Sequence, residues 1–142
     1  MKKKVVSVPL RAELNLPIKL MWLSLIVFRF KREEYRSASN VQVRRLFNRF
    51  HDRFGHSSFR PFLAVLRAGY SMRSSAVVVL VDGIDLIRTM PGKEPPPKHP
   101  EWGEPIGDHF VLHIGSVIKT ASYADVKKWM NQRGGLECKS GT

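Results

Sequence analysis

The amino-acid sequence predicts a single α+β domain in which a mainly antiparallel sheet packs against about three helices. A chain of 142 residues has the length of one ordinary domain, and its 43% apolar and 25% charged residues are typical of a folded globular protein. Some segments have the helical spacing of apolar side chains, and others are dense in β-branched residues. The two kinds of segment do not alternate regularly along the chain. This irregular order argues against a parallel doubly wound sheet.

The first apolar segment covers residues 20–30, and we expect it to be an N-terminal strand. Both alternating sets of its side chains are mostly apolar, so a central strand and a buried helix fit its periodicity equally well. Its Trp, Ile, Val and Phe residues favour the strand, and Pro17 fits a strand start. The apolar run covers only the nine residues 20–28, whereas a transmembrane helix needs about twenty residues.

The clearest predicted element is a helix over residues 39–54. Ser39 followed by Gln42 forms a capping-box pattern that would satisfy two backbone donors at the helix start. Gly55 follows where a left-handed C-cap residue belongs. The helix carries apolar residues at spacings of four, three and four, which favours a core stripe over a stacking platform for bases. These residues are Val43, Phe47, Phe50 and Phe54.

A second, shorter helix is predicted over residues 59–68, after a turn at 55–58. Pro61 would lie in its first turn and Gly69 would close it. Two helices joined by so short a turn are also compatible with a helix-turn-helix motif, which is a weaker alternative.

The second half of the chain predicts two β-hairpins. In the first, residues 76–81 and 84–89 flank Asp82-Gly83, a dipeptide that accepts the positive φ angles of a tight turn. In the second, residues 109–114 and 117–120 flank Gly115-Ser116. Between the hairpins, residues 91–105 hold six of the nine prolines and predict an irregular loop that could dock a protein partner.

The last predicted helix runs over residues 122–133, with Val126, Trp129 and Met130 turned inward. Gly134-Gly135 would end it. We therefore expect one domain over residues 1–135, followed by a flexible tail at 136–142.

Positive charge is concentrated in the first half of the chain. Lys and Arg number 24 against 12 Asp and Glu, which gives a net charge of +12. Residues 1–75 contain 16 basic and 4 acidic side chains, whereas residues 76–142 contain 8 of each. Arginine predominates in the basic half, and its planar fork suits phosphate oxygens. The plainer alternative is a solvated basic face without a dedicated partner.

The arginines of the 39–54 helix are the best functional signal. Arg45, Arg49 and Arg53 are spaced by four and form one row, where their like charges repel unless an anion lies across them. We therefore expect a non-enzymatic module that binds RNA or DNA, or works within a ribonucleoprotein, through phosphate contacts. The candidate nucleic-acid-binding residues are Arg44, Arg45, Arg49, Arg53, Arg60, Arg67 and Arg73.

The sequence predicts no cofactor and no metal site. His109 and His113 would lie on a strand about 13 Å apart, which is too far for one ion to bridge. Phosphate-binding glycine loops and nucleophile elbows are absent from the sequence. The single cysteine, Cys138, can form neither an internal disulfide nor a cysteine-based zinc site. We therefore expect a cytoplasmic or other reducing intracellular location.

The stretch Asp108–Leu112 (DHFVL) resembles the histidine-bearing strand of papain-like cysteine peptidases, over five residues. The resemblance implies that His109 would be a general base. It also implies a nucleophilic cysteine upstream on a helix, whereas Cys138 follows the histidine. On this alternative the chain is a degenerate hydrolase fold that lacks its nucleophile.

A third alternative is a docking subunit of a larger protein assembly, or a protein that binds an anionic membrane surface. The docking features would be Lys2–Lys4, the apolar segment 20–30 and the proline-rich loop.

Overall fold

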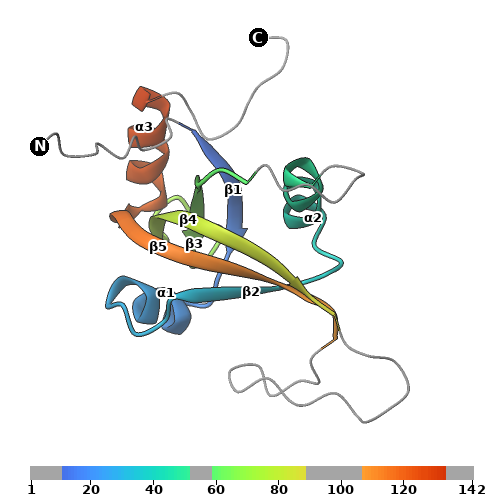
Figure 1. Ribbon diagram of the computed structural model, residues 1–142. Coiled ribbons are helices and arrows are strands. Elements are labelled where there is room, and N and C mark those ends of the chain that lie inside the picture. The colour runs from blue at the N-terminus through green and yellow to red at the C-terminus, as the bar shows by residue number, and fades with distance from the viewer. Residues whose placement is uncertain (1–10, 52–58, 89–106, 134–142) are drawn as a thin grey trace, which may run out of the picture.

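The computed structural model of the chain describes residues 11–51, 59–88 and 107–133 (Figure 1). These residues form one five-stranded sheet and three helices, which confirms the predicted α+β class. The strands are β1 (Ala12–Pro17), β2 (Glu33–Ser37), β3 (Phe62–Arg67), β4 (Ser75–Ile87) and β5 (His109–Ser122). The helices are α1 (Leu20–Val27), α2 (Val41–Phe50) and α3 (Tyr123–Arg133).

The strands lie in the order β1-β3-β4-β5-β2. Only β1 and β3 pair in parallel, and the other three pairings are antiparallel. The sheet is therefore mainly antiparallel, as the sequence predicts.

The two predicted hairpins are wrong, because β4 and β5 pair with each other along their whole length. Their register runs from Ser75 opposite Ser122 to Ile87 opposite His109, with three irregularities. Asp82-Gly83 lies inside β4, where Gly83 is opposite His113 next to one of these irregularities. A Cβ atom at Gly83 would lie 3.0 Å from the His113 ring. Glycine therefore fits this position because the ring lies close to the backbone, and not because the chain turns there. Gly115-Ser116 likewise lies inside β5.

The predicted strand at 20–30 and the predicted helix at 59–68 are both wrong. The first segment forms α1, which buries Leu23 and Ile26 at helical spacing. The second forms β3, which lies between β1 and β4 and is buried on both faces from Phe62 to Leu66. A strand buried on both faces loses the alternation that would distinguish it from a helix, so local pattern could not decide either segment.

The helices α2 and α3 confirm two of the predicted elements. The N-cap of α2 is Asn40, whose Oδ1 accepts a hydrogen bond from the Val43 amide at 3.1 Å. The predicted capping box is wrong, because the Ser39 hydroxyl lies 2.8 Å from the Ser37 hydroxyl and outside the helix. The predicted helix end at 52–55 lies outside the described residues.

The apolar core has two parts, one on each face of the sheet. On the first face α1 and α2 cover the sheet with five buried side chains, which are Leu23, Ile26, Val43, Leu46 and Phe50. On the opposite face α3 contributes Tyr123, Val126 and Met130. The first part is the larger, and it includes most of the inward side chains of β4 and β5.

The two edge strands β1 and β2 approach each other although they lie at opposite ends of the strand order. The Arg36 guanidinium of β2 donates a hydrogen bond to the Pro17 carbonyl at the end of β1. The same guanidinium lies 3.8 Å from the Glu34 carboxylate, which is only 2% exposed. Burial lowers the pKa of Arg36 below its ordinary value, and the Glu34 charge opposes this shift. The hydrogen bond from Arg36 to Pro17 therefore links the two edge strands, and Glu34 on the same strand as Arg36 supplies the counter-charge of the buried guanidinium.

Replacing Glu34 by Gln is expected to lower the free energy of unfolding by about 3 kcal/mol, because it leaves a buried guanidinium without its counter-charge. The double variant Glu34→Gln/Arg36→Met should lose less than the sum of the two single variants. Urea unfolding of all four proteins measures the coupling. Strict additivity would show that the charges of Glu34 and Arg36 are not coupled in the folded protein.

Replacing Gly69 by Ala is expected to destabilise the fold by about 1–3 kcal/mol, because residue 69 has a backbone conformation that side chains rarely adopt. Its φ is +138°, and an added Cβ would lie 2.7 Å from the Ser74 hydroxyl. Gly107→Ala is the matched control, because a Cβ there meets nothing within 4 Å. Equal thermal unfolding midpoints for the two variants would contradict the expectation.

Candidate nucleic-acid interface

Helix α2 separates apolar and basic side chains onto different faces. Val43, Leu46 and Phe50 are buried in the core, and Phe50 packs against the rings of Phe59 and Phe62. Arg44, Arg45 and Arg49 are all exposed. The predicted division of this helix into a core stripe and an arginine row is therefore present in the described part of the helix, whereas Arg53 lies outside the described residues.

Each exposed arginine of α2 has different surroundings. The Arg49 guanidinium lies 3.2 Å from the Glu13 carboxylate of β1, with the two side chains 62% and 39% exposed. An ion pair so open to solvent contributes little to stability and can exchange its partner. Arg44 donates a hydrogen bond from Nε to the Ala38 carbonyl at 3.0 Å, which orients its guanidinium. Arg45 has no ion pair among the residues that the structure describes.

A pocket of about 290 Å³ lies beside this row, between α2 and the ends of β4 and β5 that lie nearest to it. It brings Arg88, which directly follows β4, next to Arg44 and Asn48 of α2. Two arginines and an asparagine thus line one pocket, in which Asp108 is the one acidic residue. The lining consists of Ala38, Arg44, Phe47, Asn48, Leu86, Arg88, Asp108 and Phe110.

Arg88 and Asn48 are the residues that sequence reasoning missed. Arg88 belongs to the electrically neutral half of the chain and lies more than forty residues from Arg44, so no spacing links the two. Arg88 lies beside α2 only because β4, which it follows, ends near that helix. Asn48 has the spacing of four from Arg44 that places both on one helix face, which is a signal that could have identified it.

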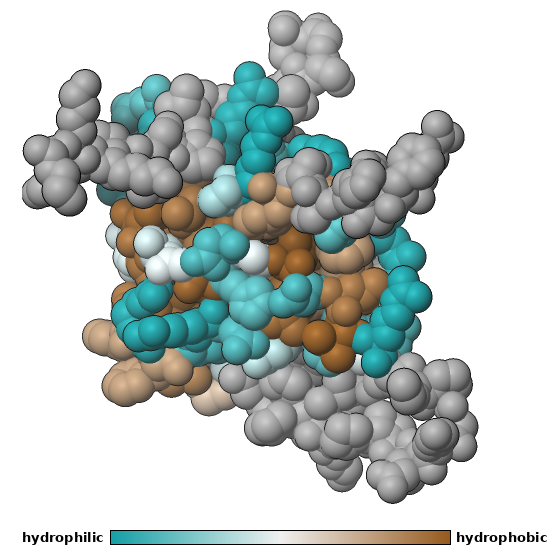
Figure 2. Space-filling model, in the orientation of Figure 1, coloured by the Kyte–Doolittle hydropathy of each residue, from teal (hydrophilic) through white to brown (hydrophobic). Residues whose placement is uncertain are grey.

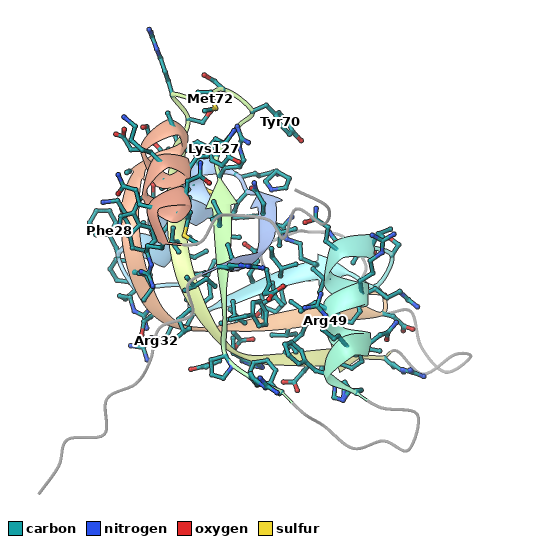
Figure 3. The ribbon with its side chains drawn as sticks, turned by 90° about the horizontal axis from the view of Figure 1, so that it is seen from above. Phe28, Arg32, Arg49, Tyr70, Met72 and Lys127 are labelled. Carbon is teal, nitrogen blue, oxygen red and sulfur yellow. The ribbon has the colours of Figure 1, made fainter. Side chains whose placement is uncertain are left out.

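The remaining predicted arginines do not form one surface with α2. Arg60 is exposed just before β3, near the end of α2. Arg67 lies at the far end of β3, where its Nε donates to the Gly69 carbonyl at 2.8 Å and its guanidinium lies 3.4 Å from the ring centre of Tyr123. Arg73 follows in the β3–β4 loop, whose Tyr70 and Met72 lie well away from Arg49 in Figure 3. Arg67 thus holds this loop against α3.

A larger groove of about 550 Å³ lies between the edges β1 and β2. Its most deeply buried cation, Arg36, is paired with Glu34 and Pro17. The groove therefore lacks exposed guanidinium groups such as those of Arg44, Arg45 and Arg49, and we assign no phosphate contact to it.

His109 and His113 lie on one strand, β5, as predicted. His109 is 7% exposed, and its Nδ1 lies 2.9 Å from the Gly107 carbonyl oxygen. His113 Nε2 lies 2.6 Å from Asp85 Oδ2 on β4. Within the described residues no group of three or more His, Cys, Asp or Glu side chains could hold a metal ion. Cys138 and the proline-rich loop at 91–105 lie outside those residues.

No protein-family model matches the chain, and no curated protein or solved structure shows a significant match to it. In the part of the chain that the structure describes, none of the helices is both long and apolar enough to cross a membrane. Any functional inference must therefore come from the charge and geometry described above.

Replacing Phe50 by Ala is expected to lower the free energy of unfolding by about 3–5 kcal/mol, because it opens a cavity between α2 and β3. Val41→Ala, at a position that is 58% exposed on the same helix, should change it by less than about 0.5 kcal/mol. Denaturant unfolding measures both variants. Similar losses in the two would show that the faces of α2 are assigned wrongly.

Proposed function

We propose that this protein is a non-enzymatic nucleic-acid-binding or ribonucleoprotein-type module that contacts phosphate through α2. The observation that carries the proposal is the convergence of Arg44 and Arg88 on one pocket beside the exposed Arg45 and Arg49. The contact surface is thus defined by these four arginines, and we call it the α2 surface.

Arg45 and Arg49 of the α2 surface carry like charges, and the exposed Glu13 carboxylate pairs only with Arg49. Arg45 and Arg49 are one helical turn apart, and like charges at this spacing repel by a few tenths of a kcal/mol, roughly 0.2–0.5. Neither side chain belongs to the core. A row of phosphates laid across the helix would remove the repulsion, and the planar guanidinium fork matches two phosphate oxygens.

The pocket beside the row suits a phosphodiester group better than a fully ionised monoester. It combines two arginines and an asparagine amide with the Asp108 carboxylate, so its net charge is close to +1. A backbone phosphate in a nucleic acid carries one negative charge. The pocket would therefore fix the register of the strand while Arg45 and Arg49 contact neighbouring phosphates.

Fluorescence anisotropy with a labelled single-stranded RNA and a labelled duplex DNA over a series of salt concentrations tests the proposal. If all four arginines contact duplex phosphates, log affinity should fall with log salt with a slope of about 3–4. Weak binding with no salt dependence would refute phosphate contact.

The double variant Arg45→Ala/Arg49→Ala is expected to reduce that slope by about 2 on every sequence tested. Its free energy of unfolding should change by less than about 0.5 kcal/mol, because both side chains are exposed. The matched control is Lys127→Ala/Lys128→Ala, which removes the same charge from exposed positions on α3 and should leave binding nearly intact. An equal effect of the two double variants would mean that only net charge matters and that α2 is not the interface.

A further inference from the structure

The segment around α1 exposes large apolar side chains to solvent. Leu20 and Met21 at the start of the helix are 58% and 64% exposed, and Phe28 and Phe30 after its end are 71% and 83% exposed. Figure 2 shows brown and tan atoms that stand out from the surface at the lower left, where Figure 1 places α1. We call these four side chains the α1 patch.

The helix itself has no polar face to turn to water. Its eight residues are LMWLSLIV, and Ser24 is the only polar one. Only Leu23 and Ile26 are buried against the sheet. A helix that is apolar on all sides is normally covered on all sides, so the outer side of α1 lacks a covering layer in the described part of the chain.

The end of α1 holds both phenylalanines outward at a cost in backbone conformation. The amide of Arg29 bonds to the Ile26 carbonyl at 3.0 Å, and that of Phe30 bonds to the Leu25 carbonyl at 2.9 Å. This is the Schellman pattern, which places residue 29 in the left-handed region that glycine favours. Arg29 has a φ of 66° there, and its guanidinium donates to the Gly115 carbonyl at 3.1 Å. Such unfavourable conformations concentrate at functional sites.

The charged side chains of the segment around α1 are all positive. Residues 19–32 contain Lys19, Arg29, Lys31 and Arg32 and no Asp or Glu. Lys19 and Arg32 are exposed at the two ends of the segment. Lys31 is 5% exposed, and its ammonium lies 4.7 Å from the ring centre of Tyr35. The α1 patch is thus an apolar surface framed by cations.

We propose that the α1 patch docks the protein onto a bilayer surface that contains anionic phospholipid. Protruding apolar side chains insert between lipid headgroups, and exposed cations around them attract the negative charge of the leaflet. A helix of eight residues is only about 12 Å long, so α1 would lie in the interface and not span the bilayer. A protein partner would have to supply both a groove for Phe28 and Phe30 and an acidic rim.

The α1 patch and the α2 surface lie on opposite sides of the molecule. Figure 3 places Phe28 and Arg32 on one side and Arg49 of α2 on the other. The proposal therefore does not rest on nucleic-acid binding, and each surface can be changed without touching the other.

Co-sedimentation of the full chain with vesicles tests the proposal. One set of vesicles is phosphatidylcholine alone, and the other includes about 30% phosphatidylserine. We expect partition into the anionic vesicles, with a partition coefficient that falls by about tenfold or more in Phe28→Ser/Phe30→Ser. Lys19→Gln/Arg32→Gln should lower it by about tenfold on the anionic vesicles.

Val41→Ser/Ile87→Ser is the matched control, because these side chains are 58% and 44% exposed on other elements. It should partition like the unchanged protein. The phenylalanine double variant should keep its thermal midpoint and its affinity for nucleic acid, which separates the two surfaces.

Three outcomes would overturn the proposal. The first is no partition into anionic vesicles at low salt. The second is equal partition of the phenylalanine double variant, which would mean attraction by net charge alone. The third is a dimer in light scattering that Phe28→Ser/Phe30→Ser dissociates, which would identify a second copy of the chain as the cover.

Discussion

The burial of β4 on both faces is the constraint on which the rest of the structure depends. Val77 and Val79 belong to the core under α1 and α2, whereas Ala76 and Val78 belong to the core under α3. A sheet with apolar side chains on both faces must be covered on both, which is why the helices divide between the two sides. At about 25 cal/mol per Å² of buried apolar area, these two cores provide the main free energy that opposes chain entropy.

Pairing with β5 along the whole length of β4 then determines where the two proposed binding surfaces lie. The irregularities between Val78 and Gly83 increase the twist of the pair, and the curled sheet brings β1 and β2 close enough for Arg36 to reach Pro17. The pairing of β4 with β5 also places Arg88, which directly follows β4, beside α2. Figure 1 shows α1 and α2 at the two ends of the molecule, so the apolar and the arginine-rich surfaces do not interfere.

Several features of the chain oppose stability, and they lie on or beside the surfaces that we propose for binding. The arginines of α2 repel one another, Arg29 occupies a left-handed conformation, and Phe28 and Phe30 expose apolar surface. None of these features improves the packing of the core. By contrast, Arg67 and Arg36 are cations that the fold uses, one against the ring of Tyr123 and one between the edge strands. Position in the tertiary structure, and not residue type, separates the two kinds of arginine.

Spacing within single short segments was enough to predict the helices α2 and α3 and the arginine row on α2. The α+β class was predicted correctly, although the two hairpins, the strand at 20–30 and the helix at 59–68 on which it was partly based were wrong. Only the tertiary structure decided that residues 20–27 are helix and 62–67 strand, because runs that are apolar on every side carry no periodicity to separate the two. It also decided that Asp82-Gly83 continues a strand, since pairing with β5 satisfies more backbone groups than two separate hairpins would. The meeting of Arg44 with Arg88 was likewise decided by the course of β4, because contacts between distant segments leave no pattern in the residues that lie between them.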